Sequence, residues 1–448
     1  MGKFPSDAQP FVRLPVGSTE NGGVNPHLSE ARRVTGTGVR QRTLIGVAAA
    51  TRMMANILMG TVLAVYIGRR GSPFAVSLVM TAYWFGLMFF APIWGAVADV
   101  TGRRRAVVIV TGSMATLAIL PLTVIDRVWI SIGLRAVYAV FAAGFLPVLL
   151  SIVSVYGGRT GRGRSIGFFN SATAAGFTLA QLTAGVLLGL LVPFEVLAVV
   201  AGVSAVATLV LVWLADPTPT PSVDPTVDEL VRAIKRRLLP GVADRAHLRT
   251  HGLRWLYVAL AIRNMTVLGI GSLLPPYLIE GVGVSTLVMG ILLAINPAGQ
   301  TAFMYVFGRI ADTIGRKPLI VGGMAASGVY ALVVASAGGS GPLALRIVVA
   351  GGAFVLLGAA YSAMTTGALA FIGDVVPPSR EAEMMGLRST AKGLGGVLGP
   401  ALIGALATLF GYQFAFATAS LLAFLAAGLA AFSLTESRST GGTITAPE

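Results

Sequence analysis

The sequence contains no cysteine and only three histidines among its 448 residues. Without cysteine, disulfide bonds, thiol nucleophiles and thiolate metal sites are all excluded. Charged residues are scarce as well, at 11% of the chain, and the 18 Asp and Glu residues are outnumbered by 33 Lys and Arg residues. A soluble protein of this length needs far more charge on its surface, so the composition argues against a soluble globule.

Hydrophobic residues make up 55% of the chain, whose mean hydropathy is +0.80. The apolar runs are long enough to cross about 30 Å of hydrocarbon as helices. The expected fold is an all-α integral membrane protein with twelve transmembrane helices in two bundles of six. The expected spans are 43–66, 74–95, 105–125, 128–156, 165–191, 194–214, 253–279, 285–307, 317–337, 342–372, 384–410 and 412–434.

The chain divides into five expected segments. Residues 1–42 are polar and basic, and we expect a disordered cytoplasmic tail there because they offer no apolar face. The two bundles are expected at 43–214 and 253–434, joined by a proline-rich cytoplasmic linker at 215–252 and followed by a tail at 435–448. Within the linker, residues 227–239 predict a short helix with Arg232, Lys235, Arg236 and Arg237 on its polar side.

The cations are distributed unevenly between the two sides of the membrane. Only Arg69, Arg70 and Arg127 fall in loops on one side. The other cations outside the spans lie on the opposite side, in the tails, the linker and the remaining loops. Arg388 and Lys392 are counted there, with the loop after the tenth span. The positive-inside rule then places both termini in the cytoplasm, in a plasma-membrane protein. Because topology accounts for the positive charge, nucleic acid is not an expected partner.

One polar loop occurs twice. The sequence GAVADVTGRRR at 95–105 returns as GRIADTIGRK at 308–317, in each case between apolar spans. Asp99 and Asp312 are 213 positions apart, and Arg52 and Arg263 are 211 apart. Three glycines of the fifth span recur in the eleventh at a constant offset of 219: Gly167, Gly176 and Gly185 correspond to Gly386, Gly395 and Gly404. This register predicts two parallel repeats related by an axis along the membrane normal.

Twelve helices as six plus six, a basic central linker and the G-x-x-x-D-x-x-G-[RK]-[RK] loops resemble the major facilitator superfamily. The resemblance implies a secondary transporter that works by alternating access, nearest in style to its drug efflux members. The chain differs at Val100 and Thr313, where the family usually has a cation. It also differs in the fifth span, which lacks the Gly-Pro pair that drug antiporters carry there and that the eleventh span has as Gly399-Pro400.

The paired loops form the predicted conformational gate. An acid at the C-terminal end of a helix is disfavoured by the helix dipole, so Asp99 and Asp312 need partners. Our hypothesis is that they latch the outward-open state by meeting the opposite half, as the resemblance implies; alternatively, the loops only anchor topology through their charge. The gate set is Gly95, Asp99, Gly102, Arg103, Arg104, Gly308, Asp312, Gly315, Arg316, Lys317, Asp374 and Arg380.

Arg52 and Arg263 lie near mid-membrane, where a cation is costly unless it faces water or a partner. They either line a central cavity or brace neighbouring helices, whereas Arg135 and Arg346 lie near the outer ends and could snorkel. The candidate cavity set is Arg52, Asn56, Arg135, Tyr138, Asn170, Gln181, Arg263, Thr266, Asn296, Gln300, Tyr361 and Thr365. Small residues predicted to allow close helix packing are Gly176, Gly185, Gly395, Gly399, Pro400 and Gly404.

No acid lies well inside a span, so the chain has no obvious buried carboxylate for proton loading. Protons remain a candidate coupling ion through Asp99, Asp312 or Asp374, and buried cations suit an anionic or zwitterionic substrate. His247 and His251 lack a third metal ligand, and neither a cofactor nor a catalytic set is expected. The sequence therefore predicts a monomeric efflux transporter for amphipathic compounds. The alternatives are uptake of a sugar or organic anion, or a receptor or enzyme on the same fold.

Overall fold

The computed structural model describes residues 26–215, 226–238, 246–377 and 380–437. Within these ranges the side chains of 26–39, 158–160, 236, 238, 246, 247, 249, 301, 381 and 382 are not described. The chain divides into two units, residues 1–42 and residues 43–448.

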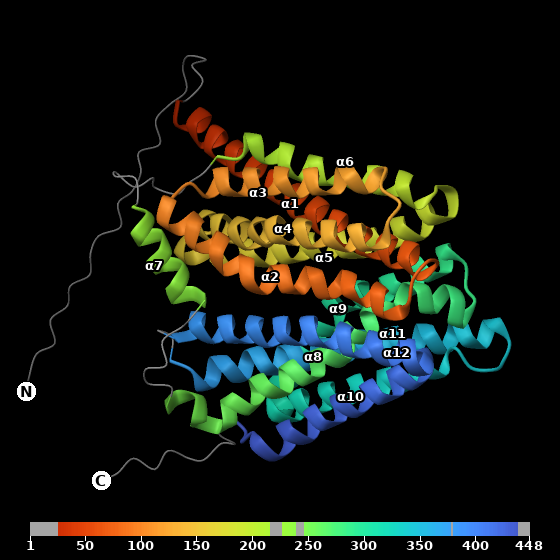
Figure 1. Cartoon of the computed structure of the whole chain (residues 1–448). Helices are drawn as coiled ribbons and strands as arrows, with labels where there is room; N and C mark the ends of the chain where they lie inside the picture. The colour runs from red at the N-terminus through yellow and green to blue at the C-terminus, as the bar shows by residue number, and fades with distance from the viewer. Residues whose placement is uncertain (1–25, 216–225, 239–245, 378–379, 438–448) are drawn as a thin grey trace, which may run out of the picture. The chain divides into compact units, whose positions relative to one another are not determined.

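Six long helices make up the N-terminal half (Figure 1). Pro occupies the first turn of α2 and α6, a position where its missing N–H has no intrahelical partner to lose. The helices are α1 (Pro26–Gly68), α2 (Pro73–Thr101), α3 (Arg104–Ile119) with the 3₁₀ turn η1 (Leu120–Thr123), α4 (Val128–Tyr156), α5 (Gly158–Leu190) and α6 (Pro193–Leu209) with the turn η2 (Val210–Trp213).

A short linker helix and five longer helices follow. The last helix is 53 residues long and is interrupted at Gly411, whose φ of +83° is non-helical. These elements are α7 (Val227–Leu238), η3 (Ala246–Gly252), α8 (Leu253–Pro276) with the π turn η4 (Tyr277–Val282), α9 (Thr286–Ile314), α10 (Lys317–Ser336), α11 (Leu343–Val375) and α12 (Glu381–Ser433).

Eleven of the described helices are long and apolar enough to cross a membrane. The break at Gly411 divides α12 where the expected spans 384–410 and 412–434 meet, so α12 supplies two crossings. The predicted twelve-helix, all-α fold is therefore confirmed. The break between the fifth and sixth spans is also confirmed, because α5 ends at Leu190 and the Glu195 carboxylate accepts a hydrogen bond from the Val192 N–H at 3.1 Å.

The expectation of a wholly disordered N-terminal tail needs correction. Helix α1 begins at Pro26, so residues 26–42 are helical, whereas residues 1–25 lie outside the described part. Pro26 suits the first turn of a helix, and Leu28, Glu30 and Ala31 are good helix formers. A lack of apolar face was a poor guide here, since a helix that continues from a stable span needs no new nucleus.

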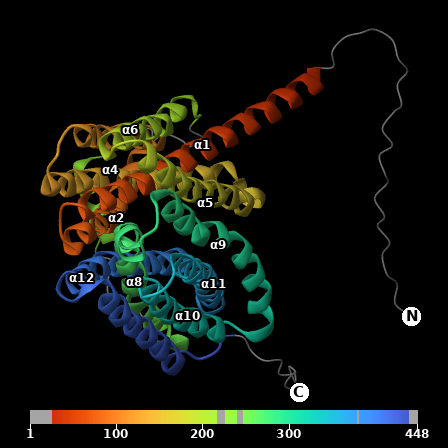
Figure 2. The ribbon, with the colours of Figure 1, turned by 90° about the vertical axis from the view of Figure 1, so that its right-hand side faces the viewer.

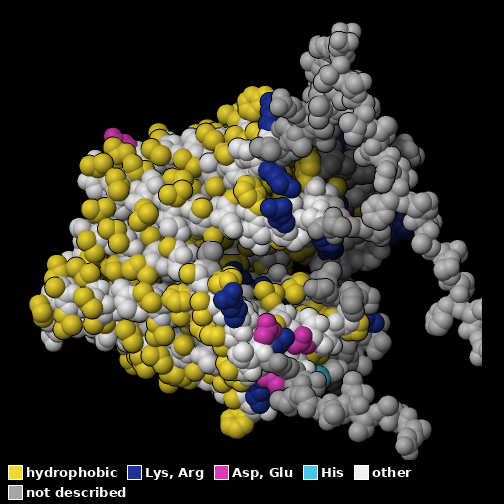
Figure 3. All heavy atoms as spheres, turned by 180° about the vertical axis from the view of Figure 1, so that it is seen from behind, with side chains coloured by type: hydrophobic (Ala, Val, Ile, Leu, Met, Phe, Trp, Pro, Cys, Tyr) yellow, Lys and Arg dark blue, Asp and Glu magenta, His cyan; other side chains and the backbone are white. Residues whose placement is uncertain are grey.

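The face of the molecule seen in Figure 3 is apolar over most of its area. Large side chains such as Leu190, Trp129 and Phe432 are 76%, 67% and 93% exposed. The charged side chains seen in this view gather mostly toward one end, where the linker also lies. A continuous apolar surface of this kind matches a multi-pass membrane protein.

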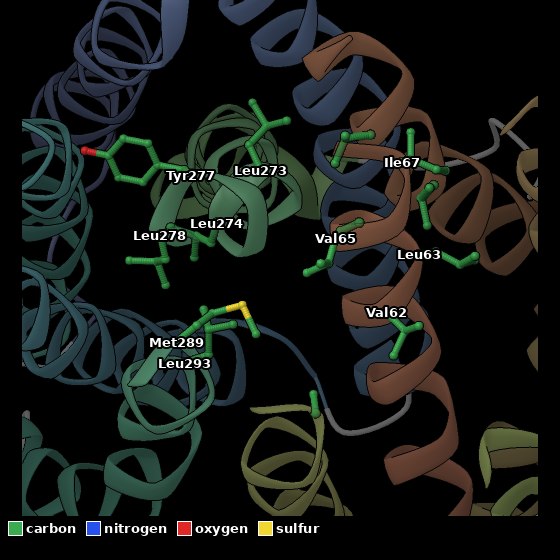
Figure 4. Close-up of a cluster of buried hydrophobic side chains, with 14 of the residues drawn as sticks. Val62, Leu63, Val65, Ile67, Leu273, Leu274, Tyr277, Leu278, Met289 and Leu293 are labelled. Atoms are coloured by element: carbon green, nitrogen blue, oxygen red, sulfur yellow. The ribbon is translucent and has the colours of Figure 1, made fainter. Parts of the chain in front are cut away.

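Among the described residues, the two halves share one apolar core, which lies at one end of the bundle. We call the end that carries α7 the linker end and the opposite end the far end. At the far end a single buried cluster joins Val62 and Val65 of α1 to Leu273, Leu274 and Met289 of α8 and α9 (Figure 4). Figure 2, which looks onto the far end, shows α2 beside α12 and α5 beside α9.

Toward the linker end the buried cores are separate. One cluster lies within the N-terminal half, around Phe145 and Leu149, and another within the C-terminal half, around Phe371 and Ile372. Hydrogen bonds that cross between the halves, such as the one from the Phe74 N–H to Thr408 Oγ1 at 2.9 Å, lie toward the far end. This structure is therefore the state in which the far end is closed.

Candidate functional site

Arg52 of α1 is 1% exposed and is held by its own half. Its guanidinium donates to Ser204 Oγ at 2.9 Å, to the Gly112 carbonyl at 3.1 Å and to Thr208 Oγ1 at 3.4 Å. The group also lies 4.2 Å from the centre of the Phe145 ring, a favourable cation–π distance. Arg52 thus connects α1 to α3, α4 and α6.

Arg263 of α8 is fully buried in the equivalent place of the other half. Its Nε donates to Ser327 Oγ on α10 at 2.9 Å, and its guanidinium carbon lies 5.8 Å from the Tyr361 ring centre. One turn away, Thr266 donates to the Ala419 carbonyl of α12 at 2.7 Å. These contacts connect α8 to α10, α11 and α12.

The expectation that Arg52, Arg263 and Thr266 line a cavity between the halves needs correction. The hydrogen bonds of all three end on helices of their own half, so the bracing alternative fits the geometry. The physical reason is that a mid-membrane guanidinium without a carboxylate is stabilised by hydroxyls, carbonyls and aromatic faces, and the neighbouring helices supply them.

Arg135 of α4 lies in an aromatic cluster of the N-terminal half. Its Nη2 donates to Asn56 Oδ1 at 3.0 Å, and its guanidinium carbon lies 4.7 Å and 5.0 Å from the ring centres of Tyr83 and Tyr138. Arg135 is only 2% exposed, so the expectation that it snorkels to the surface is wrong. Within the described part, its Nε and Nη1 and the Tyr138 hydroxyl have no hydrogen-bond partner.

The other predicted polar residues mostly connect helices within a half. Thr61 donates to Gln181 Oε1 at 3.1 Å, which links α1 to α5. Gln300 donates to Asn296 Oδ1 at 3.1 Å along α9. Thr365 is buried on α11, and Asn170 is exposed on α5. Arg346 donates to the Val282 carbonyl at 2.8 Å and so holds α11 against the end of η4.

A small pocket in the C-terminal half joins Tyr361, one of the predicted cavity residues, to five residues outside the predicted set. Its volume is about 20 Å³, enough for roughly one water molecule. Two of its residues, Arg388 and Lys392, lie on α12, which begins at Glu381, and not in the loop after the tenth span. The pocket is lined by Leu260 and Asn264 of α8, Tyr361 and Met364 of α11, and Arg388 and Lys392 of α12.

Trp84 of α2 contacts Lys392, one of the residues of this pocket, from the opposite half. The Lys392 ammonium lies 5.2 Å from the Trp84 ring centre, and the space beside Gly396 is filled by the Trp84 indole. The Trp84 N–H is buried and has no partner within the described part. The signal that could have found Lys392 is a cation within an apolar span, the same signal that pointed to Arg52.

The predicted packing glycines lie at close helix contacts, and the two halves repeat these contacts. A Cβ on Gly176 would press on the Ala50 carbonyl, and a Cβ on Gly395 would lie 2.7 Å from the Ala261 carbonyl. Ala50 and Ala261 are 211 positions apart, the same offset as Arg52 and Arg263.

The second pair of repeated contacts joins the two halves at the far end. Gly185 of α5 faces Gly290 of α9, and Gly404 of α12 faces Ser77 of α2. Ser77 and Gly290 are 213 positions apart, the same offset as the paired loops. Gly399, beside Pro400, packs against Met265 of α8. The sequence repeat is thus also a repeat of three-dimensional contacts.

The first paired loop is held by the linker helix. Asp99 pairs with Arg104 at 2.8 Å and also with Arg237 of α7. The Arg237 guanidinium lies directly over Gly95, where a side chain would displace it. Gly102 ends α2 with φ of +63°, a left-handed conformation that glycine adopts without strain. Sequence reasoning placed Arg237 on the polar side of this helix but did not pair it with Asp99.

The second paired loop is held by the segment after α12. Asp312 pairs with Arg316 at 3.4 Å, and Arg316 donates to Asp374 at 2.9 Å. The Glu436 carboxylate accepts from the N–H groups of Arg316 and Lys317 at 2.9 and 3.0 Å, at the start of α10. This carboxylate fills the space beside Gly315, whose φ is +94°, whereas nothing lies within 4 Å of a Cβ on Gly308.

In this state the ion pairs of Asp99 with Arg104 and Arg237 join the N-terminal half to itself and to the linker, and the ion pair of Asp312 with Arg316 lies within the C-terminal half. Arg103 and Arg380 of the predicted gate flank the starts of α3 and α12. His251 Nδ1 lies 2.9 Å from Thr435 Oγ1, and the side chain of His247 lies outside the described part. Among the described residues, no group of three His, Cys, Asp or Glu side chains could hold a metal ion.

Comparisons with known proteins agree with this architecture. A sequence model of the Major Facilitator Superfamily matches residues 44–354 and 256–447. The multi-drug resistance efflux pump PmrA of Streptococcus pneumoniae is 24% identical over 365 residues, which cover 79% of this chain and 85% of that protein. The PmrA homologue of Lactococcus lactis is 23% identical over 341 residues, covering 74% and 78%.

Solved structures show the same fold. The nucleoside transporter NupG superposes with a TM-score of 0.70 at 14% identity, covering 87% of this chain and 98% of that chain. A bacterial homologue of the human lysosomal transporter Spinster, in an inward-facing and unoccupied conformation, superposes with a TM-score of 0.68 at 16% identity, covering 87% and 96%.

Proposed function

Because the chain belongs to the Major Facilitator Superfamily, we propose that it is a secondary transporter that exports amphipathic small molecules by alternating access. The observation that supports export is the similarity to multi-drug efflux pumps, which covers most of both halves. The repeated contacts support alternating access, because two equivalent bundles can rock about a shared site.

The transport cycle needs two states, and the structure provides one of them. Here the far end is closed by the shared apolar core. The positive-inside rule assigns the linker end to the cytoplasm, so this state faces inward. A substrate would enter from the cytoplasm or the inner leaflet, and the opposite tilt of the halves would release it outside.

The paired loops act as the gate in this proposal. In the inward-facing state Asp99 pairs with Arg104 and Arg237, and Asp312 pairs with Arg316. Closing the linker end brings the loops toward the N-termini of the opposite half, whose unpaired N–H groups favour an acid. Asp99 then exchanges Arg237 for a partner across the halves, and Arg237 stabilises the inward-facing state.

Uptake of an organic anion is the second candidate, and one observation favours it. Buried cations occur in both halves, while the described acids near the spans lie at helix ends. The direction of transport is therefore the property that separates the two candidates. Facilitated sugar uptake lacks a specific supporting contact.

Vesicle transport tests this proposal directly. Inside-out membrane vesicles that contain the protein should accumulate an amphipathic probe, either carboxyfluorescein or ethidium, more than vesicles without it, and an imposed pH gradient should change the rate if protons are coupled. Accumulation only in right-side-out vesicles would mean uptake, and a lack of accumulation of every probe in both orientations would contradict a transport function.

A further inference from the structure

Arg388 and Lys392 place two positive charges on one face of α12. They are four residues apart, so their side chains are neighbours, and like charges at this spacing destabilise a helix. No ion pair within the described residues includes either of them. Both line the same small pocket, so this pocket is positively charged, and no acid among the described residues lines it.

Depth makes this arrangement costly. Lys392 is eleven residues from the start of α12, or about 16 Å along the helix axis, which is near mid-membrane. A cation at that depth needs an anion or a wet cavity. The pocket holds room for about one water, which is little hydration for two charges.

Comparison of the two repeats distinguishes Arg388 and Lys392 from the arginines that brace helices. Arg52 and Arg263 occur in both halves at equivalent positions and hold helices together in each. At the offset of 219 that relates α5 to α12, the positions that match Arg388 and Lys392 are Phe169 and Thr173. The fold builds one half without these charges, so the cations serve something other than the scaffold.

The residues around the two cations indicate what else a ligand of this pocket would contain. Leu260 and Met364 supply apolar walls, and the Tyr361 ring adds an aromatic surface. From the other half, Trp84 stacks against Lys392 and carries a buried N–H with no partner in the described part. An unpartnered donor beside Lys392 suits a group that only accepts hydrogen bonds, and the indole suits a flat apolar body.

We propose that this pocket anchors the anionic group of an amphipathic organic anion, a carboxylate or sulfonate joined to an aromatic body. Arg388 and Lys392 neutralise its charge, and Trp84 packs against its ring. The proposal rests on the proposed transport function and narrows its substrate class. It also predicts that amphipathic cations are poor ligands, because no described acid lines the pocket.

Binding also couples to the contact between the halves. Lys392 reaches across from α12 to Trp84 of α2 in the inward-facing state. An anion that draws Lys392 away weakens this cation–π contact, so an occupied site loosens one link between α2 and α12. Ligand occupancy can thereby favour the change of state.

The test uses two probes with the same ring and opposite charge. The purified full-length protein in detergent is titrated with 2-naphthalenesulfonate or with 2-naphthyltrimethylammonium, and its melting temperature is followed. We expect the sulfonate to raise the melting temperature in a saturable way and the ammonium to leave it unchanged. Lys392→Gln and Arg388→Gln should each weaken sulfonate binding about tenfold, the size of one charge-assisted hydrogen bond.

Arg254→Gln is the matched control, because Arg254 is exposed at the start of α8 and lies against Trp255 rather than in the pocket. It removes the same charge and should leave sulfonate binding intact. Equal stabilisation by both probes, or unchanged sulfonate binding in both pocket variants, would overturn the proposed site. Vesicles that export ethidium but not carboxyfluorescein would also overturn it while leaving the export function in place.

Discussion

A guanidinium group buried in an apolar bundle keeps its charge only if neighbouring groups replace water. Arg52 does this with two hydroxyls, one carbonyl and one aromatic ring, drawn from three helices. Such a residue holds helices together, and removing one of its partners leaves a buried N–H unsatisfied. The consequence appears in stability rather than in substrate affinity.

Ser204→Ala tests this at the residue scale. The variant removes the hydroxyl that accepts from Arg52 at 2.9 Å. We expect it to lower stability by about 1–3 kcal/mol, the cost of an unsatisfied buried donor, and to leave the KM for transport unchanged. Ser272→Ala is the control, because Ser272 donates only to the Gly269 carbonyl within its own helix. A raised KM with an unchanged melting temperature would instead assign Arg52 to substrate binding.

The residues show what sequence could and could not predict. The depth of Arg52 and Arg263 follows from their place in an apolar run, so their burial was predictable. The direction of their side chains was not predictable, because each residue rotates a helix by about 100°, and a small error in that rotation decides whether a side chain faces the other half or its own. Lys392 was missed for a different reason: it lies within the expected span 384–410, but its charge was assigned to the loop before that span.

At the scale of helices, glycines set how closely the two halves meet. A Cβ on Gly185 would lie 2.8 Å from the Thr286 carbonyl and 2.9 Å from the Gly290 Cα, both in the backbone of α9. Backbone atoms cannot move aside as a flexible side chain can, so α5 and α9 must separate. That separation acts on the state in which the far end is closed.

Gly185→Ala should therefore shift the protein toward the state in which the far end is open, by about 1–3 kcal/mol of overpacking strain. Because the chain has no cysteine, spin labels attach cleanly to Cys introduced at Val124 and Leu409, which are 80% and 72% exposed. The distance between these labels should lengthen in the variant. Gly202→Ala, on α6 with nothing within 4 Å, should not change it, and an equal change in both variants would contradict the explanation.

The linker helix supplies a second element-scale prediction. Arg237→Gln removes the ion pair between α7 and Asp99. The side chains of Arg237 and Asp99 are each 40% exposed. An exposed pair contributes about 0–1 kcal/mol, so we expect at most a fivefold shift away from the state seen here. The same label distance reports it, and high salt should reduce the difference.

Arg232→Gln provides the comparison for this variant. Arg232 lies on the same helix but donates to the Asp228 carbonyl within α7. It therefore removes an equal charge without touching α2. If Arg232→Gln and Arg237→Gln shift the equilibrium equally, the effect comes from general charge near the membrane, and the contact with Asp99 does not stabilise this state.

At the scale of the whole molecule, the repeat was readable from the sequence because two copies of one bundle must repeat their contacts. The offset that relates Arg52 to Arg263 also relates Ala50 to Ala261, each packed against a glycine. The conformational state was not readable. A transporter sequence must stabilise two states nearly equally, so no residue pattern selects one of them.

The distribution of charge assigns the orientation of the bundle, and this orientation decides whether the observed state faces inward or outward. If the linker end is cytoplasmic, the closed far end faces outside and the structure is inward-facing. Single cysteines at Val124, at the far end, and at Val227, which begins α7, separate the two orientations, because both side chains are highly exposed, at 80% and 77%. A membrane-impermeant maleimide should label Val124→Cys in intact cells and Val227→Cys only after permeabilisation. The reverse pattern would make the structure outward-facing and would turn the proposed export route into an uptake route, with the same pocket and the same gate.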